Sequence, residues 1–319
     1  MFRLGFLLLL TINLFSKDLV DLYRFSGIEE VQKEIENSLK TVDYWKNYLE
    51  NKNVEYGCYE TKQYILVAKK SQLEINLFQK VGNDYNQIFK KNIIVGGGLG
   101  DKVSQGDMKT PIGVYELVEK KTQVDQFYGP FALVTSYPNV YDQSLNKNGS
   151  GIWIHGMPYN TGRENFTKGC IALDNPELES LEKNLEFKKT ILITTETDLK
   201  KPTKDELASI LSTIFKWKDA WKNSNVEEYL SYYSTDFKKA DRSTFEQFIQ
   251  YKKMIFSKNE KKIINLSNID ISPYPNSLGK NMFRISMDEE YMSPSVKFVG
   301  NKELFVEIIN GQVKILAED

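Results

Sequence analysis

The sequence is poor in the side chains that most often carry enzyme chemistry. Its 319 residues include one histidine, His155, and two cysteines, Cys58 and Cys170. One imidazole and two widely spaced thiols form no recognisable zinc-ligand set, so we expect neither a metal nor another cofactor. With 42 Lys and Arg against 43 Asp and Glu, the formal charge is −1. This balance argues against a nucleic-acid partner, because it provides no basic footprint.

Long apolar runs are also scarce, and the one that occurs lies at the N-terminus. Residues 1–16 combine Arg3, an apolar run from Leu4 to Phe15, and the small residue Ser16. This pattern is typical of a secretory signal peptide and is short for a membrane span. We therefore expect export to the periplasm, with retention of the run as an anchor as the alternative, because Leu14 is a poor residue for cleavage.

Two cysteines in an exported protein are usually expected to form a disulfide. Cys58 lies in VEYGCYE at the start of a β-rich region, whereas Cys170 lies between Gly169 and Ile171 and beside Lys168. These contexts favour a structural role for Cys58 and a reactive one for Cys170. We expect two separate thiols, since a disulfide would prevent Cys170 from attacking a substrate.

The patterning predicts a multidomain α+β protein that begins with a helical region, residues 17–60. Apolar residues recur three or four positions apart from Ser26 to Leu49, which predicts a long helix broken near Thr41. Ser26 and Glu29 are predicted to form its capping box. The apolar stripe predicts packing on the next domain or, as a second interpretation, a homodimer contact.

Residues 62–196 show a pattern of short predicted strands separated by turns, which predicts a mostly β domain. The stretch YILVAKKSQLEINLF predicts a hairpin in which Leu73, Ile75 and Leu77 share one face. The glycines that follow are not a phosphate-binding loop, because Gly113 leads into the strand VYELV instead of a helix.

Residues 202–319 favour helices followed by an antiparallel sheet, which is an α+β module. Thr203 with Glu206, and Ser243 with Glu246, are predicted to cap two helices. Asn310-Gly311 in LFVEIINGQVKIL predicts a tight final hairpin.

The stretch GIWIHGMPYNTGRENFTKGCIAL brings together the residues that can support nucleophilic chemistry. A thiol attacks as the thiolate and needs a base, and His155 is the only imidazole available to Cys170. Strand alternation in IWIHG puts Trp153 on the same face as His155. The backbone amides of Cys170 and Gly169 are candidate donors to an oxyanion. The alternative is a structural histidine and a small buried cysteine.

Two of these segments, GIWIHG and TKGCIAL, resemble the signature of the YkuD-type L,D-transpeptidase catalytic domain, and GDMKTPIGVY resembles its upstream motif. The resemblance covers residues 62–196. It implies that Cys170 attacks the carbonyl on the L-centre of a peptidoglycan stem peptide, releasing D-alanine and leaving a thioester. It also implies that His155 acts as base and then acid, with the Gly156 carbonyl orienting its ring.

The chain departs from the family pattern beside the nucleophile. Many members carry Ser-His-Gly-Cys followed by Ile-Arg, whereas this chain has Lys168 before Gly169 and Ala172 after Ile171. The missing arginine and second histidine leave acylation intact and weaken the case for transfer to a peptide amine.

The C-terminal segment AWKNSNVEEYLSYYSTDF resembles NTF2-like domains, which form a cone of sheet and helices around a pocket. The pocket is a candidate site for a ligand of unknown class, and the sequence does not distinguish a glycan, a peptide or an empty pocket. The whole layout is similar to the murein L,D-carboxypeptidases that trim tetrapeptides to tripeptides and determine cell shape in helical and curved Gram-negative bacteria.

Four further residues are predicted to contact the substrate: Trp153, Tyr128, Arg163 and Lys168. The two cations could hold its carboxylates. The leading interpretation is a periplasmic cysteine L,D-carboxypeptidase that removes the terminal D-alanine from tetrapeptide stems. An L,D-transpeptidase that links diaminopimelate residues is the nearest alternative. A non-catalytic peptidoglycan-binding scaffold is the alternative from another class.

Overall fold

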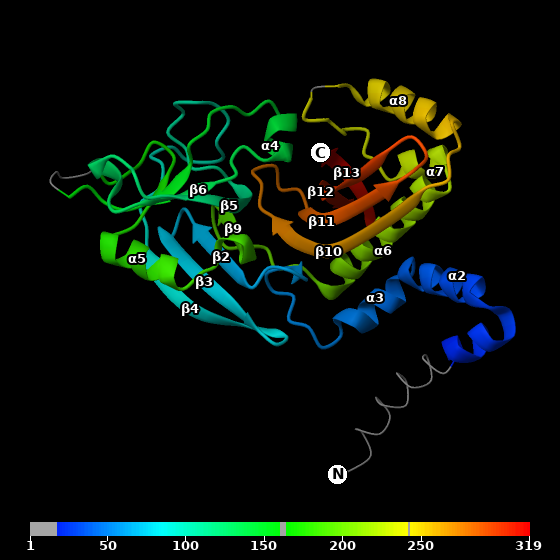
Figure 1. The fold of residues 1–319 in the computed structure, drawn as a ribbon. Coiled ribbons are helices and arrows are strands. Elements are labelled where there is room, and N and C mark those ends of the chain that lie inside the picture. Colours follow the sequence, from blue (N-terminus) through cyan, green and yellow to red (C-terminus); the bar gives the residue numbers. More distant parts are fainter. Residues whose placement is uncertain (1–17, 160–163, 242) are drawn as a thin grey trace, which may run out of the picture.

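The described part of the chain, residues 18–159, 164–241 and 243–319, folds around two β-sheets in this computed structural model (Figure 1). The predicted signal peptide and Arg163 lie outside the described residues. Within the described ranges, no helix is both long enough and apolar enough to cross a membrane.

The larger sheet forms the predicted catalytic region. As far as the structure describes the chain, it has eight strands in the order β4-β3-β2-β9-β5-β6-β7-β8, with β2/β9 and β7/β8 parallel. Leu178 and Leu181 of helix α5 (Asn175–Lys183) pack into the core of this sheet domain. Its elements are β2 (Tyr64–Lys69), β3 (Glu74–Val81), β4 (Asp84–Asn92), β5 (Gly113–Lys121), η1 (Gln126–Tyr128), β6 (Ala132–Thr135), α4 (Val140–Ser144), β7 (Trp153–His155), β8 (Ile171–Ala172), α5 (Asn175–Lys183), η2 (Phe187–Lys189) and β9 (Thr190–Thr195).

The hairpin predicted at the start of this sheet is present as β2 and β3. Ile75 and Leu77 are buried on its core face as expected. Leu73 is not part of that face: it lies in the turn with φ at 50° and is 48% exposed. The alternation rule fails there because it applies only where the backbone is already extended.

The second sheet forms the C-terminal α+β domain. Its five strands, counted over the described residues, run in the order β1-β10-β11-β12-β13, and every neighbouring pair is antiparallel. Figure 1 shows α6 and α7 along this sheet and α8 above it. Its elements are β1 (Cys58–Tyr59), α6 (Lys204–Lys222), α7 (Val226–Ser231), α8 (Phe245–Ser257), β10 (Ile263–Tyr274), β11 (Met282–Met292), β12 (Lys297–Ile309) and β13 (Gln312–Glu318).

Local signals for this domain are confirmed at two positions and wrong at a third. Thr203 and Glu206 form the predicted capping box of α6. Asn310 and Gly311, with φ at 50° and 78°, form the tight turn between β12 and β13. Helix α8 is capped one residue later than predicted, by Thr244 with Gln247. Asp241 accepts hydrogen bonds from the Ser243 amide and hydroxyl, and this turn withdraws Ser243 from the cap.

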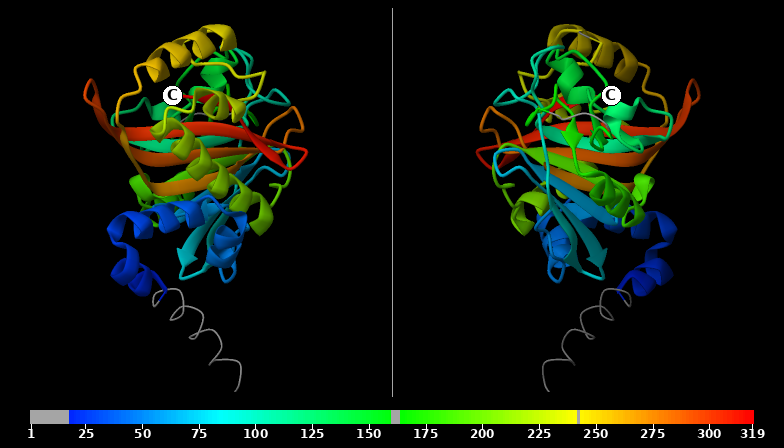
Figure 2. Two further views of the ribbon diagram at one scale, coloured as in Figure 1. Left: turned by 90° about the vertical axis from the view of Figure 1, so that its right-hand side faces the viewer. Right: turned by 90° about the vertical axis from the view of Figure 1, so that its left-hand side faces the viewer.

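The N-terminal helices pack on the C-terminal domain, whereas the segment that follows them also contacts the catalytic sheet, where Tyr56 stacks on Phe78 of β3. Its helix breaks at Thr41 as expected, giving α2 (Ile28–Leu39) and α3 (Val42–Leu49). The predicted Ser26 capping box is wrong, because residues 18–26 are already helical and Gly27 takes the N-cap position. Trp45 stacks on Phe215 of α6, and β1 pairs with β10. Figure 2 shows these blue helices at the end of the molecule away from α8.

Candidate active site

One pocket of about 280 Å³ brings the predicted nucleophile and base together. Four of the site residues predicted from the sequence line this pocket: Tyr128, His155, Lys168 and Cys170. Its other described lining residues were not anticipated: Phe127, Glu164, Phe166 and Thr167. Phe127 adjoins Tyr128, and the other three lie within six residues before Cys170. Proximity to the motifs was therefore the only sequence signal that could have identified them.

The imidazole of His155 is held in a defined orientation. Strand β7 carries it, and Ile154 points into the core on the opposite face, as the alternation predicted. The side chain is buried, and its Nδ1 lies 2.7 Å from the Gly156 carbonyl oxygen. The Tyr128 ring meets the imidazole edge-on, with centroids 5.0 Å apart. Ring packing and a backbone acceptor together restrict rotation of the imidazole.

Cys170 directly precedes β8 and follows a glycine that the local packing requires. Gly169 has φ at 128°, and a Cβ there would come within 2.8 Å of the Lys109 carbonyl oxygen. The Cys170 thiol lies 3.4 Å from the Gly151 carbonyl oxygen, to which it donates. No disulfide joins it to Cys58, as expected, and Cys58 is buried elsewhere, in the core shared with α6.

The structure distinguishes between the two predicted oxyanion donors. The Gly169 amide donates to Thr167 Oγ1 at 3.0 Å, and that hydroxyl donates to the Cys170 carbonyl at 2.6 Å. The Gly169 amide is therefore engaged within its own loop. The Cys170 amide stays the predicted oxyanion donor.

The upstream motif GDMKTP builds the wall beside this loop. The Asp107 carboxylate accepts from the Lys102 ammonium at 2.7 Å and from the amides of Val103, Ser104 and Lys109. Burial opposes ionisation, but these donors hold the pKa of Asp107 well below its usual range. Because the Lys109 carbonyl lies against Gly169, Asp107 supports the nucleophile loop from outside the pocket.

The other predicted substrate contacts, Trp153, Lys168 and Arg163, differ in their position relative to the pocket. Trp153 does not line the pocket, but its ring packs on the lining residue Tyr128, with centroids 5.2 Å apart. Lys168 is exposed at the pocket rim. Arg163 lies outside the described residues, and its role stays a prediction. Among the described residues, no group of three or more His, Cys, Asp or Glu side chains could hold a metal ion.

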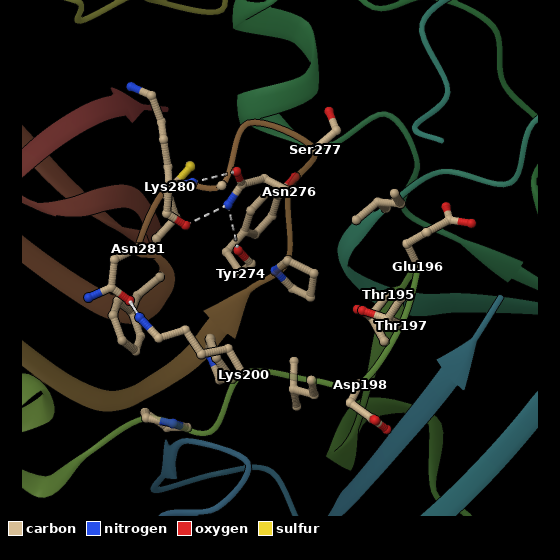
Figure 3. A pocket seen from close by; sticks show the side chains of 18 of the residues that line it. Thr195, Glu196, Thr197, Asp198, Lys200, Tyr274, Asn276, Ser277, Lys280 and Asn281 are labelled. Atoms are coloured by element: carbon tan, nitrogen blue, oxygen red, sulfur yellow. Dashed lines mark hydrogen bonds between the residues drawn. The ribbon is translucent and has the colours of Figure 1, made fainter. Parts of the chain in front are cut away.

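A second pocket, of about 320 Å³, lies at the seam between the two sheets (Figure 3). Several of its polar lining residues are hydrogen-bonded within the protein: Lys200 donates to Asn281 at 2.8 Å, and Asn276 donates to the Lys280 carbonyl at 2.9 Å. Glu196 accepts from Lys70 at 2.8 Å. The Lys200–Asn281 bond ties the interdomain linker to the β10–β11 turn, which indicates a structural junction.

Comparison with known families matches one family model to each of the two sheet-containing domains. The L,D-transpeptidase catalytic domain matches residues 62–193, and the Cds6 C-terminal NTF2-like domain matches residues 209–319. YafK of Escherichia coli strain K12, which carries the name of an L,D-transpeptidase, is 29% identical over 119 residues. That match covers 37% of this chain, which spans 45% of the length of that curated relative.

Two solved structures extend the likeness over both domains. Bd1075 of Bdellovibrio bacteriovorus is 25% identical with a TM-score of 0.64, covering 83% of this chain and 95% of that one. The helical cell shape determining protein Pgp2 of Campylobacter jejuni is 40% identical with a TM-score of 0.84, covering 88% of this chain and 100% of that one. Since this likeness spans nearly the whole of both chains, the protein belongs to the L,D-transpeptidase family, in the group that carries a C-terminal NTF2-like domain.

Proposed function

We propose that this protein is a periplasmic cysteine L,D-carboxypeptidase that removes the terminal D-alanine from peptidoglycan tetrapeptide stems. One observation carries the proposal: Cys170 and His155 line the same pocket, and the Gly156 carbonyl accepts from the imidazole Nδ1. Family membership supports peptidoglycan as the polymer acted on, and the likeness to Pgp2 supports a role in cell shape.

In the first half-reaction His155 takes the proton of the Cys170 thiol, and the resulting thiolate forms a bond to the carbonyl carbon that precedes D-alanine. The oxyanion that develops takes the Cys170 amide as its donor. The carbon–nitrogen bond then breaks, and protonated His155 gives its proton to the departing amine of D-alanine. A thioester between Cys170 and the tripeptide remains.

In the second half-reaction water attacks the thioester carbon. His155 accepts the proton of that water and returns it to the departing Cys170 sulfur, which regenerates the enzyme and releases the tripeptide. Lys168 and Ala172 stand where many family members have histidine and arginine, and this departure favours water over a peptide amine as acceptor. The exposure of Lys168 at the pocket rim supports its proposed role of attracting a substrate carboxylate.

Purified protein incubated with disaccharide tetrapeptide, with products identified by mass spectrometry, tests the proposal. Tripeptide and free D-alanine are expected. Dimers joined through two diaminopimelate residues would instead identify a transpeptidase, and unchanged substrate would favour the non-catalytic scaffold. Cys170→Ala should abolish turnover, whereas Cys58→Ser, a change at the thiol buried in the other core, should retain it.

Two partner assignments belong to the same proposal. The N-terminal helices leave large apolar side chains exposed, which supports a homodimer contact: Phe25 is 78% and Ile28 64% exposed.

The interior of the C-terminal domain holds charged residues among aromatic rings, with Lys252 Nζ 5.1 Å from the Tyr229 ring centroid. A ligand for this domain stays a prediction, as does export through residues 1–16.

A further inference from the structure

We propose that Asn175 is a positioning residue for His155, acting through the peptide group between Gly156 and Met157. Asn175 is the first residue of α5, five positions after Cys170, and it does not line the pocket. The inference deepens the proposed function, because it concerns how the general base of that reaction is oriented.

The Asn175 carboxamide forms hydrogen bonds with both backbone polar groups of Met157. Its Oδ1 accepts from the Met157 amide at 2.7 Å, and its Nδ2 donates to the Met157 carbonyl at 3.1 Å. The Met157 amide and the Gly156 carbonyl belong to one planar peptide group. Fixing the N–H end of that plane therefore fixes the direction of the carbonyl that lies 2.7 Å from His155 Nδ1.

The surrounding backbone leaves room for this carboxamide only because two residues lack side chains. A Cβ on Gly156 would come within 2.1 Å of Asn175 Oδ1, and one on Gly129 within 2.4 Å. The Gly156 amide donates to the Tyr128 carbonyl at 2.9 Å, which ties the same segment to the residue whose ring packs on the imidazole. The carboxamide thus fills a space shaped to its size.

The chemical consequence concerns the imidazole tautomer. When the Gly156 carbonyl accepts from Nδ1, the proton of neutral His155 stays on Nδ1 and the lone pair stays on Nε2. Nε2 is then the nitrogen that can take the thiol proton. If the peptide plane rotates, the Nδ1 acceptor is lost and both tautomers become accessible, so part of the population lacks a base at Nε2.

The single histidine makes this directly measurable. In the ¹⁵N-labelled protein, the imidazole nitrogen shifts report His155 alone, and we expect the Nδ1–H tautomer to dominate. Asn175→Ala should give a tautomer mixture and slow iodoacetamide alkylation of Cys170 in proportion to the fraction of His155 that leaves the Nδ1–H tautomer, by about 2- to 10-fold. With tetrapeptide, kcat should fall by the same factor while KM changes less than about twofold. Asn175→Asp keeps the acceptor for the Met157 amide and should keep the Nδ1–H tautomer.

Asn184→Ala is the matched control, because Asn184 is exposed at the other end of α5 and its carboxamide donates to the Ser180 carbonyl in its own helix. It should leave tautomer and alkylation rate unchanged. Wild-type tautomer and alkylation rate in Asn175→Ala would overturn the inference; if that variant does not fold, the same measurements on Asn175→Ser decide. Both readouts need no peptidoglycan, so an inactive wild-type protein would refute the proposed function without affecting them.

Discussion

Arg284 of the C-terminal sheet donates through Nη1 to Glu116 of the catalytic sheet at 3.0 Å. The guanidinium is 4% exposed and also pairs with Glu303, while Lys62 Nζ lies 2.6 Å from the second Glu116 oxygen. Burial alone would lower the pKa of Arg284, but the two carboxylates raise it, so the group stays charged. A buried ion-pair network thus joins the two domains.

Removal of one partner from this network should be costly. Arg284→Ala leaves Glu116 and Glu303 without their shared cation, and we expect the free energy of unfolding to fall by about 3–5 kcal/mol. Urea denaturation followed by circular dichroism measures the change. Lys46→Ala, which removes an exposed pair with Asp205, should cost less than about 1 kcal/mol. Equal losses in the two variants would contradict the structural role given to Arg284.

The Asp107 turn should weaken in acid. Because the folded pKa is held below its usual range, the carboxylate stabilises the fold above the unfolded pKa of about 4, and this contribution disappears as pH falls toward the folded value. The difference in unfolding free energy between wild type and Asp107→Asn should be constant above pH ~5 and shrink below pH ~4. Denaturant titrations across this range test it, and a difference that grows in acid would reverse the sign assigned here.

The two thiols should differ in reactivity. Burial raises the pKa of Cys58 to about 11, so its thiol stays protonated and enclosed at pH 8. We expect iodoacetamide to modify Cys170 in the native protein and to reach Cys58 only after unfolding. Peptide mapping by mass spectrometry locates the label, and native Cys170→Ala should remain unlabelled.

Glu318 should be the most sensitive carboxylate of the C-terminal domain. It accepts from Tyr233 at 2.9 Å, with Lys302 and Lys252 ammonium groups at 3.3 and 3.7 Å. Burial opposes its charge, but the two lysines lower its pKa overall. Glu318→Gln leaves two like charges partly buried and should cost about 3–5 kcal/mol in unfolding free energy. Exposed Glu290→Gln on β11 should change it by less than about 0.5 kcal/mol.

The N-terminal helices offer a test of the proposed dimer. Ile28 and Ile35 are one pair of exposed apolar residues on α2, at 64% and 42%. Placing lysine at both positions should abolish a contact made through this face without unfolding the helix, since neither residue is buried. Light scattering after size exclusion should then give a monomer mass for the variant and a dimer mass for wild type. Identical masses would remove this face as the contact.

Much of the candidate site could be predicted from the sequence because rarity limited the choices. With a single imidazole in the chain, the base for Cys170 had to be His155, and the pocket contains both. The orientation of that imidazole was not accessible in the same way, because the carboxamide of Asn175 contributes through a backbone contact that no spacing rule describes.

The sequence by itself determined the features that depend on a few adjacent residues: the Asn310-Gly311 turn, the Thr203 cap and the strand alternation around His155. The tertiary structure alone decided which domain α3 packs against, which oxyanion amide is engaged by Thr167, and what orients the base. The reason is physical: turns and caps are stabilised by their own neighbours, whereas packing and site geometry depend on contacts between residues far apart along the chain.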